Sequence, residues 1–312
     1  MTVTSRIQDR ALGKWGDILP AIGIPRDFLT GRHGPCPLCG GGKDRWRWDN
    51  KGGAGTYYCS QCGNGSGVDL VMRFLKVQFL EARREIEKHL PDARVSIPKA
   101  RTQIDLSRLE RVWLQAQHMD GTDVASRYLA GRSIDVRRDW PSQVRLVHRA
   151  LYRHEDGAKS EHPAMIARVL GNTGGWTLHY TFLDEHGRKA NVPVGKKLAA
   201  AKFPEGGAVR LARAAEVMGI AEGIETALSA SILFGMPVWA ALSAPPLARW
   251  KPPAEARSIF IFGDNDRNFT GQHASYALAQ SLTAAGYDVE VHIPKQDDCD
   301  WNDILVANGV PK

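Results

Sequence analysis

The chain has 312 residues, 43% of them hydrophobic and 24% charged, which is the composition of a globular protein large enough to bury a substantial core. No apolar run approaches the ~18 residues of a transmembrane helix, and the polar N-terminus has no signal-peptide core, so we expect a cytoplasmic protein without membrane contact. Lysine and arginine total 41 against 34 acidic residues, and the net charge of +7 favours a polyanionic partner such as nucleic acid.

Helical patterns flank a cysteine-rich segment near the N-terminus. Residues 1–30 form a short amphipathic lead-in. The tetrapeptide Ser66-Gly67-Val68-Asp69 has the form of a capping box and precedes apolar residues at helical spacing, so a helix is predicted to begin there. A second amphipathic helix is predicted over 79–90. The polar, basic and proline-containing residues 91–104 are predicted to be a linker.

Four of the five cysteines form two CxxC pairs, which in a cytoplasmic chain indicate metal ligands rather than disulfides. The pairs enclose 19 residues, a spacing typical of a four-cysteine zinc site made by Cys36, Cys39, Cys59 and Cys62. A glycine follows each pair, where the chain must turn tightly. Four protein ligands leave no open coordination position, so this zinc is predicted to be structural.

The residues between the pairs have strand composition with a turn near residues 50–53, and they predict the hairpin of a zinc ribbon. The first strand alternates arginine and tryptophan over Arg45, Trp46, Arg47 and Trp48. This pattern suits base stacking and phosphate contacts in single-stranded nucleic acid, and the basic net charge favours that interpretation. The alternative is that both tryptophans form the core of the ribbon and the arginines are solvated.

The remainder of the chain changes its pattern twice. Residues 105–131 have helical spacing, and residues 144–210 alternate short apolar runs with glycine-rich turns, which predicts antiparallel strands. After that, apolar runs alternate with helical segments, which predicts a parallel sheet with right-handed crossovers. The predicted strands are 217–221, 237–242, 258–262 and 288–293, and the clearest helices are 224–234 and 272–285.

Acidic residues follow three of these predicted strands. Glu222 comes after the first, Asp264 and Asp266 after the third, and an acidic cluster over 297–303 after the fourth. Ligands of open parallel sheets bind beyond the carboxyl ends of the strands, and carboxylates gathered there need a cation such as Mg²⁺ or Mn²⁺. A helix cap or a ribose contact would explain one such acid alone. No dinucleotide-binding GxGxxG follows a strand, and no P-loop occurs.

At this point the sequence resembles TOPRIM-type DNA primases of phages, satellite phages and plasmids. The resemblance to their zinc-binding domain lies in GPCPLCGGGKDRWRWDN and GTYYCSQCGNGSGVDLV. The resemblance to their TOPRIM domain lies in MGIAEGIETALSA, SIFIFGDND and DCDWNDIL. Residues 126–134 are similar to the YLxxRG-type segment that opens the primase core. The resemblance implies an α/β chain in which a zinc ribbon precedes a core with an antiparallel N-terminal subdomain and a parallel TOPRIM subdomain.

The resemblance also implies roles for individual residues. Glu222 matches the TOPRIM glutamate, to which the family assigns metal binding or acid–base work, and Asp264 and Asp266 match the DxD metal ligands. Asp300 and Asp303 resemble the later acidic cluster of the magnesium site, whose spacing varies.

Positive residues of primases that hold template or nucleotide are matched by the basic run Arg188, Lys189, Lys196, Lys197 and Lys202. Glu225 is offset from the second acid of the EGxxD pattern, and the resemblance gives it no role. The helicase module fused to many phage primases is not matched, so a separate helicase is expected as a partner.

The function that the resemblance implies is that of a stand-alone primase of a primosome. Such an enzyme makes short RNA primers from NTPs on single-stranded DNA by Mg²⁺-dependent nucleotidyl transfer, here for a phage, plasmid or other mobile element. Two alternatives stay open, a single-strand-binding accessory without catalysis and a TOPRIM nuclease. The expected domains are a zinc-binding domain (1–90), a linker (91–104), the N-terminal part of the core (105–215) and TOPRIM (216–312).

Overall fold

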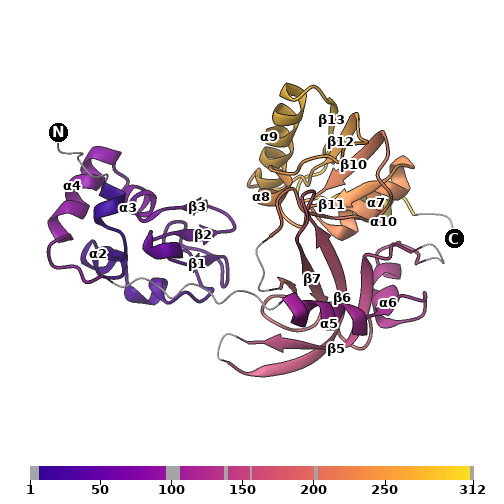
Figure 1. Ribbon diagram of the computed structural model, residues 1–312, viewed down its shortest axis with the longest axis horizontal. Coiled ribbons are helices and arrows are strands. Elements are labelled where there is room, and N and C mark those ends of the chain that lie inside the picture. The colour runs from indigo at the N-terminus through magenta and orange to yellow at the C-terminus, as the bar shows by residue number, and fades with distance from the viewer. Residues whose placement is uncertain (1–6, 96–105, 137–139, 155–156, 200–202, 310–312) are drawn as a thin grey trace. The chain divides into compact units, whose positions relative to one another are not determined.

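The structure, a computed structural model, describes residues 7–95, 106–136, 140–154, 157–199 and 203–309. The chain divides into two compact units, Met1–Gln103 and Ile104–Lys312, which are described separately (Figure 1). Most of the predicted linker, residues 96–104, lies outside the described residues. None of the described helices is long and apolar enough to cross a membrane.

The first unit is a small three-stranded antiparallel sheet, in the order β1-β2-β3, surrounded by short helices. The sheet carries the cysteines, and it confirms the predicted ribbon hairpin. Its elements in chain order are α1 (Ile7–Arg10), α2 (Trp15–Ala21), η1 (Arg26–Leu29), β1 (Trp46–Trp48), η2 (Lys51–Gly53), β2 (Tyr57–Cys59), β3 (Gly63–Gly65), α3 (Gly67–Leu75) and α4 (Phe79–His89).

The predicted capping box is present at the start of α3. The backbone N–H of Asp69 donates to Ser66 Oγ (3.4 Å), and the backbone N–H of Ser66 donates to Asp69 Oδ2 (2.7 Å). Two N–H groups of the first turn thereby find partners. The next residue, Gly67, has room for no side chain, because a Cβ there would overlap the indole ring of the fully buried Trp15. Helix α3 therefore begins in direct contact with α2.

The second unit is built on one mixed sheet. Its strand order is β13-β12-β10-β11-β9-β6-β5-β4, and β7 pairs with β6 and β8. The elements before the parallel part are α5 (Leu106–Gln115), β4 (Gln117–His118), α6 (Val124–Ala130), β5 (Val144–Arg153), β6 (Lys159–Leu170), β7 (Trp176–Phe182), β8 (Lys196–Leu198) and β9 (Ala208–Val209). Strands β4 to β9 pair antiparallel, as predicted.

Strands β10 to β13 form the predicted parallel part of the sheet. The elements are β10 (Val217–Ala221), α7 (Ile224–Phe234), β11 (Val238–Ala240), α8 (Ala244–Leu247), β12 (Ser258–Phe262), α9 (Thr270–Ala284), β13 (Asp288–His292) and α10 (Trp301–Ala307). The bounds of β10, α7 and β12 are those predicted. Helix α10 was not predicted, because its first turn lies inside the acidic cluster that was interpreted as ligands.

Two hydrophobic cores cover the two faces of the parallel strands. Helices α8 and α9 pack on one side, where Trp239, Trp250 and Leu278 are buried, while α7 and α10 pack on the other, where Phe262 and Leu305 are buried (Figure 1). Strand β9 joins the two halves of the sheet, since it pairs with both β6 and β11. The boundary expected near residue 215 therefore divides one continuous sheet.

A serine after helix α6 has a backbone conformation that favours glycine. Ser133 has φ +60°, and the N–H groups of Ser133 and Ile134 donate to carbonyls of the last turn of α6. The left-handed region costs a non-glycine residue roughly 1–2 kcal/mol, part of which glycine returns through its freer unfolded chain.

We expect Ser133→Gly to raise the free energy of unfolding by about 0.5–1 kcal/mol, measured by urea denaturation. Ser281→Gly is the matched control, because Ser281 lies exposed inside helix α9, where glycine should lower the same quantity by about 0.5 kcal/mol. A loss of stability in Ser133→Gly would contradict the assigned conformation.

Candidate functional site

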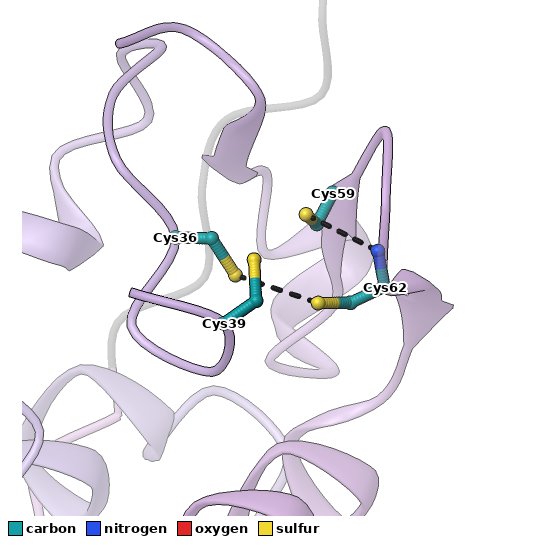
Figure 2. A group of neighbouring side chains, drawn as sticks. All are labelled: Cys36, Cys39, Cys59 and Cys62. Carbon is teal, nitrogen blue, oxygen red and sulfur yellow. Dashed lines mark hydrogen bonds between the residues drawn. The ribbon is translucent and has the colours of Figure 1, made fainter. Parts of the chain in front are cut away.

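The four cysteines of the first unit converge from two segments, the loop before β1 and the end of β2 with the turn that follows it (Figure 2). Their sulfur atoms all lie within 4.8 Å of one another, and Cys36 Sγ lies 3.9 Å from Cys62 Sγ. A tetrahedral zinc ion with Zn–S bonds of about 2.3 Å requires sulfur–sulfur distances of about 3.8 Å. Burial raises the pKa of Cys36, so a cation is needed to stabilise the thiolates. The donor set fits zinc.

Backbone geometry directs both segments toward the sulfur atoms. Each pair is followed by a glycine of positive φ, +65° at Gly40 and +79° at Gly63, as the sequence predicted. The N–H of Leu38 donates to Cys36 Sγ (3.4 Å), and the N–H of Cys62 donates to Cys59 Sγ (3.3 Å). These hydrogen bonds favour the thiolate form that metal binding requires. The chain therefore contains a four-cysteine zinc site.

The predicted nucleic-acid contact of Trp46 is wrong, because this side chain belongs to the core of the first unit. Only 1% of Trp46 is exposed, its ring stacks on Tyr57 with centroids 4.9 Å apart, and its Nε1 donates to the carbonyl of Phe28 (2.8 Å). Trp48 is half-buried against the same core. The aromatic side chain that β2 exposes is Tyr58, 37% accessible.

Arg45, just before β1, and Arg47, within it, are both partly buried and have partners within the ribbon. Arg45 donates to the side chain of Gln61, and Arg47 lies 3.9 Å from a carboxylate oxygen of Asp49. Their predicted contact with nucleic acid stays a prediction.

In the second unit, parallel pairing brings the predicted acids to one edge of the sheet. Ala221 at the end of β10 lies opposite Phe262 at the end of β12, so Glu222 and Asp264 follow their strands at nearly the same level. Asp266 lies in the loop between β12 and α9, where its Oδ2 accepts a hydrogen bond from the N–H of Gly271 (2.9 Å).

The edge is crowded with negative charge. Burial, and secondarily the charge of Asp266, raises the pKa of Glu222 to about 7. Burial, and then the charges of Glu222, Asp300 and Asp266, raises the pKa of Asp264 to about 8. These carboxylates therefore resist ionisation together unless positive charge is added.

Two buried carboxylate oxygens without hydrogen-bond partners indicate where positive charge would be bound. Glu222 Oε2 and Asp264 Oδ1 are buried and have no hydrogen-bond partner among the described residues. Unsatisfied carboxylate oxygens at the end of a parallel sheet suit a hard divalent cation. Among the described side chains, however, only the four cysteines already form a group gathered closely enough for a metal ion. The acids share an edge without forming such a group.

Asp300 and Asp303 form a second capping box, at the start of α10. Asp300 Oδ1 accepts from the N–H groups of Asn302 (2.7 Å) and Asp303 (2.9 Å), while Asp303 Oδ2 accepts from the N–H of Asp300 (3.0 Å). Capping explains why both acids are present. Asp300 is still near enough to Asp264 to raise its pKa, so it stays a candidate magnesium ligand.

The predicted basic residues are divided between two environments. Lys196 Nζ lies 2.7 Å from a carboxylate oxygen of the buried Glu225, close to the acids. Its neighbour Lys197 points to the other face of β8, where it donates to the carbonyl of Arg153 (3.0 Å) and lies over the ring of Tyr152. The structure does not bring Lys197 to the acids. Lys202 lies outside the described residues.

A cleft of about 680 Å³ lies between α6, the turn before residue 190 and α10. Arg132, Arg188 and Lys189 line it with positive charge, and Asn302 and Val306 of α10 line it as well. The sequence patterns assign Arg132 no role. Such a wall suits a phosphate-bearing ligand.

Comparison with known families identifies the class of this protein. Residues 31–68 match the zinc-binding domain of primase-helicases, residues 217–310 match the Toprim domain, and residues 105–211 match a domain of unknown function. With the zinc-binding domain of a primase-helicase before a Toprim domain, the chain has the domain composition and order of a Toprim-domain DNA primase, an enzyme of DNA replication.

Several solved structures show weak similarity. A primase of Aquifex aeolicus (zinc-binding and RNA polymerase domains) is 15% identical with a TM-score of 0.45, over 98% of this chain and 83% of the other. A DNA primase domain of Pseudomonas aeruginosa is 13% identical with a TM-score of 0.45, over 65% and 75%. The primase fragment of the bacteriophage T7 primase-helicase is 12% identical with a TM-score of 0.37, over 89% and 95%. The class of the protein rests on the family matches alone.

We expect Cys36→Ser to release the zinc ion and to unfold the first unit, since structural zinc contributes directly to folding. Zinc content of the purified protein, measured by atomic absorption, should fall from about one ion per chain to near zero. Cys299→Ser is the control, because Cys299 lies in the second unit. Retention of one zinc ion by Cys36→Ser would refute the four-cysteine site.

Proposed function

We propose that the protein synthesises short RNA primers on single-stranded DNA by Mg²⁺- or Mn²⁺-dependent nucleotidyl transfer, with NTPs as substrates. The observation that carries the proposal is the pair of buried carboxylate oxygens, one on Glu222 and one on Asp264, that have no hydrogen-bond partner among the described residues and feel the charge of Lys196. The resemblance of the sequence motifs to phage, satellite-phage and plasmid primases supports a mobile-element setting, in which a separate helicase unwinds the template.

The acids and the basic residues would divide the chemistry between them. Glu222, Asp264 and Asp266 would hold the divalent cation, which neutralises the nucleotide's phosphates and lowers the pKa of the attacking 3′-hydroxyl. Asp300, whose charge contributes to the raised pKa of Asp264, would be a further ligand. Lys196 would bind the triphosphate, whose α-phosphate is attacked by the 3′-hydroxyl as pyrophosphate leaves.

The cleft beside α10 supports a role in holding the template strand. Lys189 is partly buried, and burial, with the charges of Lys196 and Arg132, lowers its pKa, so a bound phosphate would relieve the repulsion among these cations. Arg188 stands at the mouth of the cleft in an exposed ion pair with Asp184 (3.0 Å).

We expect the double variant Asp264→Asn, Asp266→Asn to lose primer synthesis while it keeps single-strand binding within about twofold, since phosphate contacts elsewhere dominate binding. The measurement is extension of labelled NTPs on single-stranded DNA with Mg²⁺. Asp298→Asn is the control, because Asp298 is an exposed carboxylate paired with Arg267.

Three outcomes separate the candidate functions. Short products from wild type and Asp298→Asn alone support a primase. Metal-dependent degradation of the DNA, without synthesis, would identify a Toprim nuclease. Binding without either reaction, also in the presence of a replicative helicase, would identify an accessory protein.

We expect Lys189→Ala to weaken single-strand binding and to reduce the slope of log affinity against log salt by about 0.7, the value for one lost phosphate contact. Lys251→Ala is the control, because Lys251 is exposed and already paired with Glu205. An unchanged salt slope in Lys189→Ala would remove the template from this cleft.

A further inference from the structure

Glu225 is a buried carboxylate to which sequence patterns assign no role. It lies in the first turn of α7, one turn after Glu222, and only 5% of it is exposed. Its Oε1 accepts a hydrogen bond from the hydroxyl of Tyr128 (2.6 Å), and its Oε2 accepts one from Lys196 Nζ (2.7 Å). Both oxygens therefore have partners.

This arrangement distinguishes Glu225 from the two acids that each have one unsatisfied carboxylate oxygen. Glu222 Oε2 and Asp264 Oδ1 are unsatisfied among the described residues, whereas Glu225 is saturated by a hydroxyl and an ammonium group. Burial alone would raise the pKa of Glu225, but Lys196 and the Tyr128 hydroxyl together hold it at about 2. Glu225 is consequently an ionised, fixed partner of Lys196.

Lys196 in turn lies near the candidate metal site. Its side chain is 39% exposed at the edge of β8, and its partner Glu225 lies one helical turn after Glu222. A lysine side chain has four rotatable bonds, and without a fixed partner it would sample many positions. The contact with Glu225 restricts it to one, beside the acids.

Glu225 is itself fixed by elements from both halves of the sheet. Tyr128 comes from α6, and the guanidinium group of Arg132, two residues after α6, lies over the Tyr128 ring. Arg132 donates to the side chain of Asn302 in α10 (3.0 Å), and Asn302 donates to Ser229 Oγ in α7 (3.0 Å). The chain of contacts returns to the helix that carries Glu225, so the carboxylate cannot move independently.

We propose that Glu225 is a positioning residue, which holds Lys196 Nζ at the acid edge so that the ammonium group binds a phosphate of the incoming nucleotide. The inference deepens the proposed primase activity and rests on it. It makes Glu225 an anchor of the nucleotide-binding lysine and not a third carboxylate ligand of the cation.

The test uses Glu225→Gln in the full-length protein, with Glu255→Gln, an exposed glutamate, as the control. Glutamine keeps the size of the side chain but loses the charge that fixes the ammonium. We expect the KM for NTP to rise about tenfold, kcat to stay within about threefold, and the Mg²⁺ concentration for half-maximal activity to stay unchanged. Lys196→Met should raise the KM to a similar extent.

The double variant Glu225→Gln, Lys196→Met decides between positioning and independent roles. If Glu225 acts through Lys196, the KM of the double variant should equal that of Lys196→Met, because the two effects are not additive. The double variant also removes the unpaired buried charge that either single change could leave, and it keeps the test valid if a single variant fails to fold.

Other outcomes would overturn the inference. A raised Mg²⁺ requirement that excess Mg²⁺ restores would make Glu225 a metal ligand. A lower melting temperature with unchanged KM would make the pair purely structural. Equilibrium binding of ATP in Ca²⁺ provides a readout without synthesis: if wild type makes no primer, the proposed function fails, whereas equal ATP affinity in wild type and Glu225→Gln means that this inference fails.

Discussion

The repulsion between Glu222 and Asp264 is the constraint on which the second unit depends. Parallel pairing of β10 with β12 places both carboxylates at one buried edge, where burial raises their pKa values to about 7 and about 8. A fold that served stability alone would not leave one buried oxygen of each carboxylate without a partner among the described residues, because each side chain could be replaced by an apolar or fully hydrogen-bonded one. Among the described side chains, the only positive one that acts on both carboxylates is Lys196, which comes from β8.

Local patterns predicted the parts of the protein whose determinants are close in sequence. The capping box at Ser66, the positive-φ glycines after each cysteine pair and the bounds of β10 and β12 all depend on a few consecutive residues. The partners of Glu225 could not be predicted in this way, because Lys196 is 29 and Tyr128 is 97 positions away in the chain. Helix α10 was missed because a capping box and a cluster of metal ligands use the same residue types.

The misassignment of Trp46 has a different cause. Alternation of arginine and tryptophan along β1 indicates that the two residue types lie on opposite faces, but it does not say which face is solvated. In a unit of this size the tryptophans are needed inside, where Trp46 and Trp15 are among the largest fully buried side chains. The zinc site and the hydrophobic core are thus continuous, since Cys36 and Cys59 belong to the same buried cluster as Trp46 and Trp15.

Strand β9 consists of Ala208 and Val209 alone, yet it is hydrogen-bonded to β6 on one side and to β11 on the other. Two half-sheets linked in this manner cannot pivot as rigid bodies without breaking backbone hydrogen bonds that both halves share. The second unit can therefore deform only by gradual twisting of its one continuous sheet. A force applied to the antiparallel strands would therefore be transmitted through Ala208 and Val209 to the parallel strands, which carry the carboxylate edge.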